Sequence, residues 1–217
     1  MNIHGLILAA GLSSRMGAFK PLMRIRGQSL LALSVESLLT GGATEITVVL
    51  GYRAREVALE LEELFPPGQV QIAFNPAFSE SDMLTSVKVG VAALPPCDAF
   101  FLLPGDMPAV NQDTFLRLRQ MMEEQLPAVT FPTVEGYRKH PPLIGATCRK
   151  NILNYRGTSG LRGVWSVLEG AIAEVPVTDE GCLMDADTLL DFERLARYLA
   201  LRNPQPTAPE RVVIGHS

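Results

Sequence analysis

The first residues that could do chemistry lie in a glycine-rich segment near the N-terminus. Residues 10–17 read AGLSSRMG, and Lys20 follows three positions later. Gly11 and Gly17 allow a sharp turn in which backbone N–H groups can point at phosphate oxygens. Arg15 can bind a phosphate through its planar guanidinium, and Lys20 adds a mobile positive charge. The segment therefore predicts a binding site for phosphate groups.

Two commoner phosphate-binding motifs do not match this segment. Five residues separate Gly11 from Gly17, and Lys20 is not next to Gly17, which excludes the G-x-x-x-x-G-K-[ST] loop. Gly11 is followed by Leu-Ser, which excludes G-x-G-x-x-G. The alternative interpretation is an ordinary tight turn between a strand and a helix, with charged residues on the surface.

Carboxylates in two later segments could hold a divalent metal ion. Asp106 comes directly after an apolar stretch that ends in Pro-Gly, so its side chain is expected at the edge of a sheet. Mg²⁺ is usually bound by one or two protein carboxylates together with phosphate oxygens. Asp185 and Asp187 are separated by one residue and could meet one cation, or cap the helix that follows. A plain turn is the alternative role of Asp106.

Alternating strands and helices must position these residues. Apolar and β-branched runs predict strands, and apolar residues at helical spacing predict helices. The expected strands are residues 3–9, 45–50, 70–74, 99–103, 128–131 and 173–177. The expected helices are residues 29–40, 54–64, 82–94, 112–125, 161–168 and 188–200, and residues 132–155 are expected to form a hairpin or an extra strand.

This order predicts an α/β fold: a mostly parallel sheet with helices on both faces. Such sheets bind ligands beyond the carboxyl ends of their strands. Asp82 is expected to be the N-cap of its helix, and Thr188 with Asp191 resembles a capping box. Residues 1–202 are expected to form one domain, and the Pro-rich residues 203–217 a flexible tail.

Composition narrows the classes of function. The chain has 217 residues and a formal net charge of −4, so it has no overall attraction for nucleic acid or an anionic membrane. No apolar run is long enough for a membrane span or a signal segment. Three cysteines at wide spacing predict neither disulfides nor a zinc site, which favours the reducing cytoplasm. No Ser/His/Asp triad or Cys–His pair can be recognised.

The pattern L-A-A-G-x-x-x-R-M-G-x-x-K resembles the signature of the MobA-like nucleotidyltransferases of molybdenum cofactor maturation, most closely the cytidylyltransferases. These enzymes share a Rossmann-like fold of the nucleotide-diphospho-sugar transferase type. The resemblance extends from about Ile3 to Tyr198. It implies that Arg15, Lys20 and Asp106 are catalytic. It also implies that the nucleotide is bound by Leu8, Ala9, Ala10, Gly11, Ser13 and Ser14.

Later segments resemble the family with some departures. The order G-D-M-P matches the metal-binding aspartate at Asp106. A family D-x-D-T-P-E-D segment reads DADTLLD here, which favours Asp185 as a second metal ligand and gives Asp187 a mainly structural role. Family segments N-P-x-x and G-M-x-x-S imply that Asn75 and Ser86 contact the base and ribose, although Asp82 stands where glycine is usual. A turn and a capped helix are the plainer interpretation.

Two segments imply an acceptor site. His140 lies in a segment resembling G-H-P-x-L, with Lys139 in place of the glycine. Arg162 lies in a segment resembling G-D-x-G-x-R, with Thr158 in place of the aspartate, so the usual acceptor is in question. A surface or hydrogen-bonded histidine is the alternative for His140.

The resemblance implies transfer of a nucleotidyl group to an acceptor phosphate, with Mg²⁺ as cofactor and pyrophosphate released. Among relatives L-A-A-G resembles the cytidylyl-transferring group, which favours CTP and a molybdopterin-type acceptor. A molybdoenzyme or its chaperone is then a possible transient partner. The alternatives are a sugar- or alcohol-phosphate acceptor, or a non-catalytic accessory protein that binds a nucleotide or cofactor.

Overall fold

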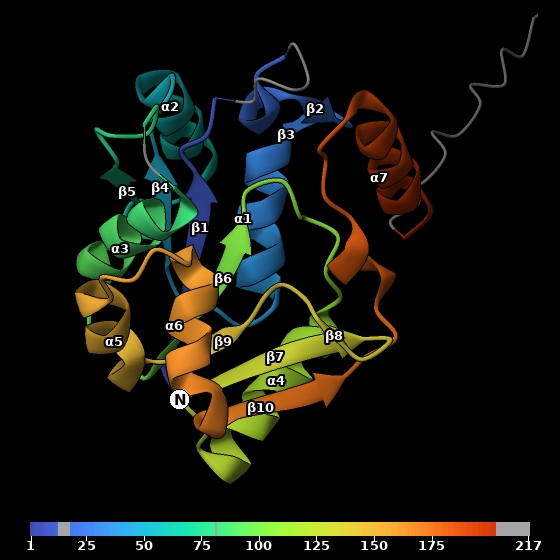
Figure 1. Ribbon diagram of the computed structural model, residues 1–217. Helices are drawn as coiled ribbons and strands as arrows, with labels where there is room; N and C mark the ends of the chain where they lie inside the picture. The colour runs from blue at the N-terminus through green and yellow to red at the C-terminus, as the bar shows by residue number, and fades with distance from the viewer. Residues whose placement is uncertain (13–17, 81, 203–217) are drawn as a thin grey trace, which may run out of the picture.

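The computed structural model describes residues 1–12, 18–80 and 82–202, which form a central sheet covered by helices (Figure 1). Neighbouring strands of the main sheet follow the order β10-β7-β9-β6-β1-β4-β5, and β8 pairs with β7. The strands of this sheet are β1 (Ile3–Ala9), β4 (Ile46–Leu50), β5 (Val70–Phe74), β6 (Ala99–Pro104), β7 (Val129–Val134), β8 (Tyr137–Arg138), β9 (Leu143–Gly145) and β10 (Ile172–Pro176). A separate two-stranded sheet pairs β2 (Arg24–Ile25) with β3 (Gln28–Ser29).

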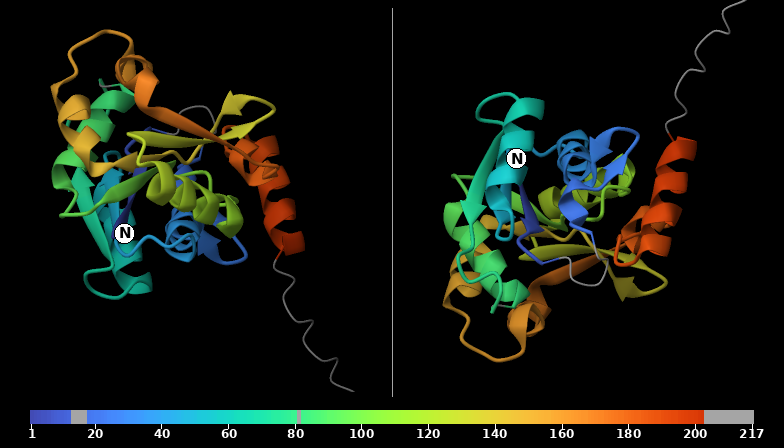
Figure 2. Two further views of the ribbon diagram at one scale, coloured as in Figure 1. Left: turned by 90° about the horizontal axis from the view of Figure 1, so that it is seen from below. Right: turned by 90° about the horizontal axis from the view of Figure 1, so that it is seen from above.

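Helices cover both faces of the main sheet, as the two views in Figure 2 show. They are α1 (Leu30–Thr40), α2 (Ala54–Leu64), α3 (Met83–Ala93), α4 (Gln112–Gln125), α5 (Arg149–Asn154), α6 (Gly160–Leu168) and α7 (Leu189–Arg202). Single 3₁₀ turns form at η1 (Lys20–Leu22), η2 (Ala146–Cys148), η3 (Glu169–Ala171) and η4 (Glu180–Leu183). The predicted α/β class with a mostly parallel sheet is confirmed.

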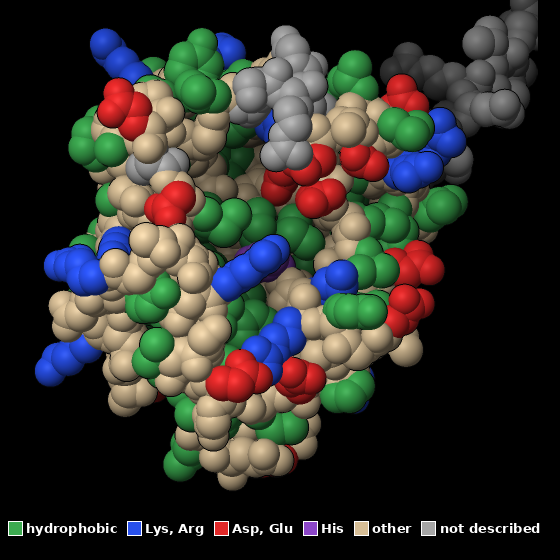
Figure 3. Space-filling view, viewed as in Figure 1, with side chains coloured by type: hydrophobic (Ala, Val, Ile, Leu, Met, Phe, Trp, Pro, Cys, Tyr) green, Lys and Arg blue, Asp and Glu red, His purple; other side chains and the backbone are tan. Residues whose placement is uncertain are grey.

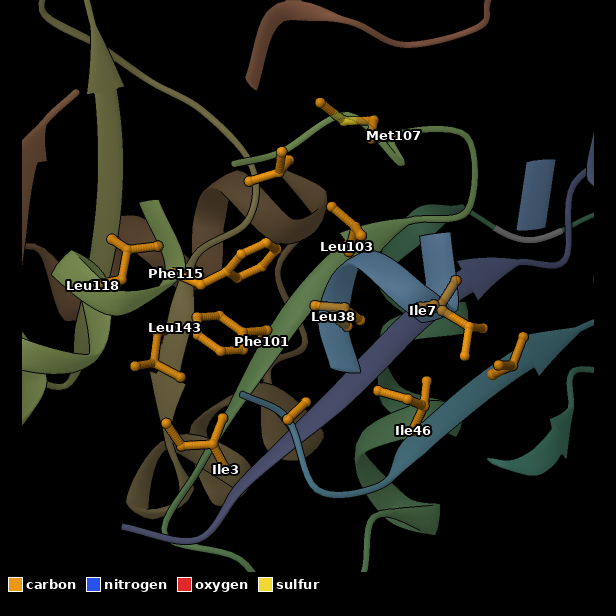
Figure 4. Close-up of a cluster of buried hydrophobic side chains, with 14 of the residues drawn as sticks. Ile3, Ile7, Leu38, Ile46, Phe101, Leu103, Met107, Phe115, Leu118 and Leu143 are labelled. Carbon is orange, nitrogen blue, oxygen red and sulfur yellow. The ribbon is translucent and has the colours of Figure 1, made fainter. Parts of the chain in front are cut away.

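Strand β1 lies in the middle of the sheet and is apolar because both of its faces are buried. It pairs in parallel with β4 on one side and with β6 on the other. Successive side chains point to opposite faces, so Ile7 and Ala9 join the core under α1, α2 and α4, whereas Leu6 and Ala10 join the core under α3, α5 and α6. In the first of these cores, Phe101 and Phe115 meet edge to face at 5.0 Å between ring centroids (Figure 4).

The N-terminal caps predicted for two helices, α3 and α7, form in the structure. The Asp82 side chain accepts a hydrogen bond from the backbone N–H of Thr85 at 3.0 Å, so Asp82 is the N-cap of α3. At α7, the Thr188 N–H donates to Asp191 at 3.1 Å and the Asp191 N–H donates to the Thr188 hydroxyl at 3.2 Å. Both caps therefore form as the sequence predicts.

Two local elements differ from the sequence prediction. Residues 132–155 contain the expected extra strands, β8 and β9, but also the helix α5, which has only six residues and is too short to show a helical period. The small β2–β3 hairpin was not expected; Arg26 and Gly27 turn it, both with positive φ. The predicted tail at residues 203–217 lies outside the described residues. Among those that are described, no helix has the length and apolar character needed to cross a membrane.

Asp179 connects the segment after β10 to the start of α4. Its buried carboxylate accepts hydrogen bonds from the backbone N–H of Asn111 at 2.8 Å, the hydroxyl of Thr114 at 2.8 Å and the backbone N–H of Gly181 at 2.9 Å. The Asn111 side-chain amide donates a further bond at 2.5 Å. Four donors satisfy a carboxylate that would otherwise be costly to bury. This network fixes the path of the chain that leads on to Asp185 and Asp187.

We expect Asp179→Ala to lower the free energy of unfolding by about 3 kcal/mol, because several charge-assisted hydrogen bonds are lost and their donors remain buried. Urea denaturation of the parent and the variant measures the change. Glu180→Ala, at the exposed neighbouring position, is the matched control and should change the free energy by less than about 0.5 kcal/mol. Equal losses in the two variants would show that the network does not hold this segment.

Candidate active site

A cavity of about 380 Å³ opens at the carboxyl ends of β1 and β6. Its walls come from the end of β1 and the loop after it, from η1, from the start of α3 and from the turn after β6. The lining residues are Leu8, Ala9, Ala10, Gly11, Leu12, Lys20, Pro21, Phe78, Asp82, Met83, Ser86, Pro104, Gly105 and Asp106. Many of the residues singled out in the sequence therefore come together in one place. Ser13, Ser14 and Arg15 lie outside the described residues.

The turn after β6 is packed closely against the end of β1. The Gly105 N–H donates a hydrogen bond to the Leu8 carbonyl at 2.9 Å. A Cβ added at Gly105 would lie 3.1 Å from the Ala9 Cβ and 3.2 Å from the Leu8 oxygen, so a side chain here would press on the backbone of β1. This close approach places the next residue, Asp106, at the floor of the cavity.

Lys20 lies between two carboxylates that come from distant parts of the sequence. Its Nζ is 3.0 Å from Asp106 Oδ2 and 2.7 Å from Asp187 Oδ1. Burial lowers the pKa of Lys20, but the hydrogen bonds and charges of Asp187 and Asp106 outweigh it, so the net pKa is raised. The lysine is therefore fully protonated at neutral pH and holds the two carboxylates together.

The structure gives Asp187 a tertiary contact that the sequence did not predict. The sequence favoured a mainly structural role for it at the mouth of the last helix. The capping bonds of α7 are made by Thr188 and Asp191, and Asp187 instead pairs with Lys20. Residue types at a helix mouth suggested capping, and only the tertiary fold could bring Lys20 to this aspartate.

Asp185 adds a third negative charge to the same region. The residue as a whole is exposed, but its carboxyl group is partly surrounded by protein. This partial burial is the first cause that raises its pKa, and the charges of Asp187 and Asp106 raise it further. Lys20 lowers this pKa in part, without cancelling the other effects. Carboxylates thus crowd around one ammonium group.

The donor set is suited to a hard cation that also binds a ligand. In the described part of the chain, no group of three ligating side chains lies close enough together to hold an ion alone. Asp106 and Asp187, however, both approach one positive charge, that of Lys20. Two carboxylates, with the remaining positions filled by phosphate oxygens and water, are what Mg²⁺ usually takes in proteins.

Asn75 and Ser86 are brought together on the α3 side of the cavity. The Asn75 side-chain amide donates to the Ser86 hydroxyl at 3.0 Å, and the Asn75 oxygen accepts from the Ala77 N–H at 3.0 Å. Asn75 is buried and does not line the cavity, whereas Ser86 does. Asn75 therefore positions the Ser86 hydroxyl.

The two residues expected on the acceptor side do not line this cavity. His140 Nδ1 is 3.3 Å from the Leu102 carbonyl oxygen, so we assign the hydrogen to Nδ1. Burial lowers the pKa of His140. The hydrogen bond to Leu102 and the charge of Asp106 raise it in part, but the net pKa is lowered. The ring is therefore neutral at pH 7 and lies near the carboxylates. Arg162 is exposed on α6, and no described residue forms a hydrogen bond or ion pair with its guanidinium.

The space-filling view shows how charge is divided on this face of the molecule (Figure 3). Acidic side chains gather in its upper part, and basic side chains extend across the middle below them. A hollow lies between these groups. The face thus offers carboxylates for a cation next to basic groups for an anion.

Several lining residues, among them Phe78, Asp82 and Met83, were not named by the sequence analysis as parts of a ligand site. Asp82 was expected only as a helix cap. In the structure it caps α3 and also lines the cavity. Met83 lies in the segment that resembles G-M-x-x-S, but only Ser86 of that segment was named, and Phe78 carries no charge or motif that distinguishes it from an ordinary loop residue. Their place in the site depends on how the loop after β5 folds back over β1.

We expect Asp185→Asn to raise the free energy of unfolding at pH 7. A carboxyl group whose folded pKa is raised destabilises the protein once the pH rises above its ordinary value of 3.8. Removal of the charge should therefore stabilise the protein at neutral pH, and the gain should vanish below that value. The gain should be less than about 1 kcal/mol, because Asp185 is exposed and solvent screens its charge.

Urea denaturation at pH 7 and at pH 3 measures the effect. Glu62→Gln removes a charge at an exposed position on α2, away from the carboxylates, and should leave the stability nearly unchanged at both values. Loss of stability in Asp185→Asn at pH 7 would contradict the crowding of charge described above.

Comparison with known proteins identifies the kind of domain. The family of MobA-like NTP transferase domains matches residues 5–175. The molybdenum cofactor cytidylyltransferase of Escherichia coli (strain K12) is 29% identical over 190 residues, which cover 88% of this chain and 93% of that protein. The nicotine blue oxidoreductase of Paenarthrobacter nicotinovorans is 27% identical over 200 residues, which cover 89% of this chain and 96% of that protein.

Solved structures support the same fold. A nucleotidyl transferase from Methanothermobacter thermautotroptrophicus aligns with a TM-score of 0.77 at 24% identity, over 93% of this chain and 99% of that one. The family resemblance and the predicted nucleotide-diphospho-sugar transferase fold are thus confirmed.

Proposed function

The chain belongs to the MobA-like NTP transferase family, and we propose that it transfers a cytidylyl group from CTP to a phosphorylated acceptor. The observation that carries the proposal is the placement of Lys20 and Asp106 in a cavity lined by the L-A-A-G turn at the end of β1. A positive charge, carboxylates and exposed backbone at one edge of a parallel sheet are what a nucleoside triphosphate requires.

The reaction needs charge neutralisation and alignment more than a strong base. An acceptor phosphate is already ionised at neutral pH, so its oxygen can attack the α-phosphorus directly. A new P–O bond forms there, and the bond from the α-phosphorus to the bridging oxygen breaks, so that pyrophosphate leaves with the electron pair. Lys20 would hold the phosphate oxygens, and the turn from Ala9 to Gly11 would supply backbone N–H groups.

Asp106 and Asp187 are the residues that would hold Mg²⁺, with Asp185 nearby. The ion would neutralise negative charge on the triphosphate when bound. Lys20, which lies between Asp106 and Asp187, would contribute a second positive charge beside the phosphates.

The choice of CTP as the nucleotide and the choice of the acceptor rest on similarity to relatives. Pairwise similarity to a molybdenum cofactor cytidylyltransferase, together with the Ala9-Ala10 pair, supports CTP and a molybdopterin-type acceptor. Arg162, which lies on α6 next to α3, and the neutral His140 would contact this acceptor. Delivery of the product to a molybdoenzyme or its chaperone, in the cytoplasm, would follow from such a role.

Pyrophosphate release tests the function directly. Purified protein is incubated with Mg²⁺, each of the four nucleoside triphosphates in turn, and either molybdopterin cofactor or a sugar phosphate. We expect release with CTP and the molybdopterin cofactor. Release with a sugar phosphate alone would replace the acceptor assignment, and binding of CTP without any release would indicate an accessory protein.

Asp106→Asn should abolish Mg²⁺-dependent pyrophosphate release while the protein stays folded. The amide keeps the shape of the side chain but loses the charge that a hard cation requires. Activity is measured as kcat/KM for CTP, with folding checked by circular dichroism. Asp113→Asn, the same change at an exposed position on α4, should leave kcat/KM unchanged. Near-parent turnover in Asp106→Asn would place the metal elsewhere.

Lys20→Ala should weaken CTP binding by about tenfold to a hundredfold, because a charge-assisted contact contributes roughly 1.5–3 kcal/mol. Isothermal titration of the parent and the variant with CTP and Mg²⁺ gives the two dissociation constants. Lys150→Ala removes an exposed lysine on α5, outside the cavity, and should bind CTP like the parent. If Lys20→Ala did so too, Lys20 would have no role in holding the triphosphate.

A further inference from the structure

Phe78 forms part of the cavity wall at the end away from the metal-binding carboxylates. It lies in the loop between β5 and α3 and is half-buried. Two strands, β1 and β4, separate β5 from β6 in the sheet, and Asp106 follows β6. The phosphates would lie near Lys20 and Asp106, so the end with Phe78 is left for the nucleoside.

The protein leaves no room for Phe78 to move back from the cavity. A Cβ added at Gly51 would lie 2.4 Å from the Phe78 Cβ and 2.6 Å from the Ala10 carbonyl oxygen. The phenylalanine is therefore in direct contact with the backbone after β4. A larger ligand at this end would meet a side chain that has solid protein behind it.

Two further aromatic rings support this wall. Tyr52 packs on Phe78 with ring centroids 6.4 Å apart, and Phe19 meets Tyr52 edge to face at 5.6 Å. The Arg53 guanidinium lies 4.9 Å from the centre of the Phe19 ring and also pairs with Glu56. The rings come from three separate loops, and Phe19 directly precedes Lys20. The wall at the nucleoside end is thus connected to the residue that would hold the phosphates.

The same end of the cavity has a fixed hydroxyl that could read a base, in addition to the Asp82 carboxylate at the start of α3. Asn75 holds the Ser86 hydroxyl, which lines the cavity. The Ala10 methyl lies on the same face of the sheet and belongs to the core under α3. A base at this end would therefore meet a hydroxyl at its polar edge and an apolar wall opposite.

We propose that Phe78 sets the upper size of the base, so that the single ring of a pyrimidine fits and the second ring of a purine is excluded. The inference rests on the proposed function, since it assumes that the cavity holds a nucleoside triphosphate. It adds a residue that determines specificity, and the phenyl ring of this residue obstructs far more space than the Ala10 methyl does.

Binding of the four nucleoside triphosphates to the full chain, with Mg²⁺ and without acceptor, tests the proposal. Isothermal titration gives the ratio of the dissociation constants for GTP and CTP. We expect the parent to favour CTP, and Phe78→Ala to reduce that preference by about tenfold or more, since misfit of a few atoms in a pocket typically changes binding tenfold or more. Phe78→Trp should act in the opposite sense and weaken CTP binding as well.

Phe74→Ala is the matched control, because Phe74 lies at the exposed end of β5 and does not line the cavity. Its ratio should equal that of the parent. Should Phe78→Ala fail to fold, Phe78→Leu keeps the apolar contact with Tyr52 and should still shift the ratio toward GTP, though by less.

The outcomes separate this inference from the proposed function. A parent that favours UTP over CTP while excluding purines would overturn cytidylyl transfer and leave the size limit supported. A parent that favours CTP, with an unchanged ratio in Phe78→Ala, would overturn the size limit alone. Equal loss of CTP and GTP binding would mean that Phe78 stacks on any base, and a parent that favours GTP would overturn both proposals.

Discussion

The pairing of Lys20 with Asp106 and Asp187 draws together parts of the chain that are 86 and 167 residues apart. Lys20 follows the glycine-rich segment, Asp106 follows the strand β6, and Asp187 precedes the last helix, α7. The contact is strong because the lysine is partly removed from water, where charges interact at a lower effective dielectric constant. Without it, the Asp106 and Asp187 carboxylates would lose the positive charge that both of them pair with. The turn η1, the turn after β6 and the segment before α7 are therefore held together through the Lys20 ammonium group.

The sheet and its turns set the limits within which this contact can form. Leu8 pairs with Val49 of β4 and with Pro104 of β6, so three strands end at one level. Gly105 lets the turn after β6 come within van der Waals distance of β1. On the far side, the Asp179 network ties the segment that carries Asp187 to the start of α4. Each of these features fixes the path of the backbone, and the path of the backbone decides where the charged side chains of the site can lie.

The sequence predicted the elements well because burial on both faces of the sheet gives long apolar runs, and because Asp82 and Thr188 are strong capping residues. It predicted the cavity's chemistry from the types of Lys20 and Asp106, whose charges stand out beside glycine and apolar residues. It did not predict the ion pair of Asp187 with Lys20, because a helix mouth offers a local role and the distant partner is not visible in the sequence. Phe78 escaped notice because its role depends on Gly51, whose missing side chain makes room for the ring. Local patterns identify residues with charge or special backbone, but they do not identify an apolar wall assembled from three loops.

The cavity differs chemically from one end to the other, and this difference would orient a ligand. Among the described residues, the end around Asp106 holds carboxylates and one lysine; the pKa of Asp185 is raised there, first by partial burial and then by the charges of Asp187 and Asp106. Around Phe78, whose ring is backed by Tyr52, the cavity also holds the Ser86 hydroxyl, fixed by the buried Asn75 amide, and the Asp82 carboxylate. A triphosphate with its cation relieves the charge at the first end, and a flat base buries its faces at the second. The reverse orientation would bury phosphate against the Phe78 ring and leave the carboxylates without a cation, so in the proposed function the two ends of the cavity would favour one direction of binding.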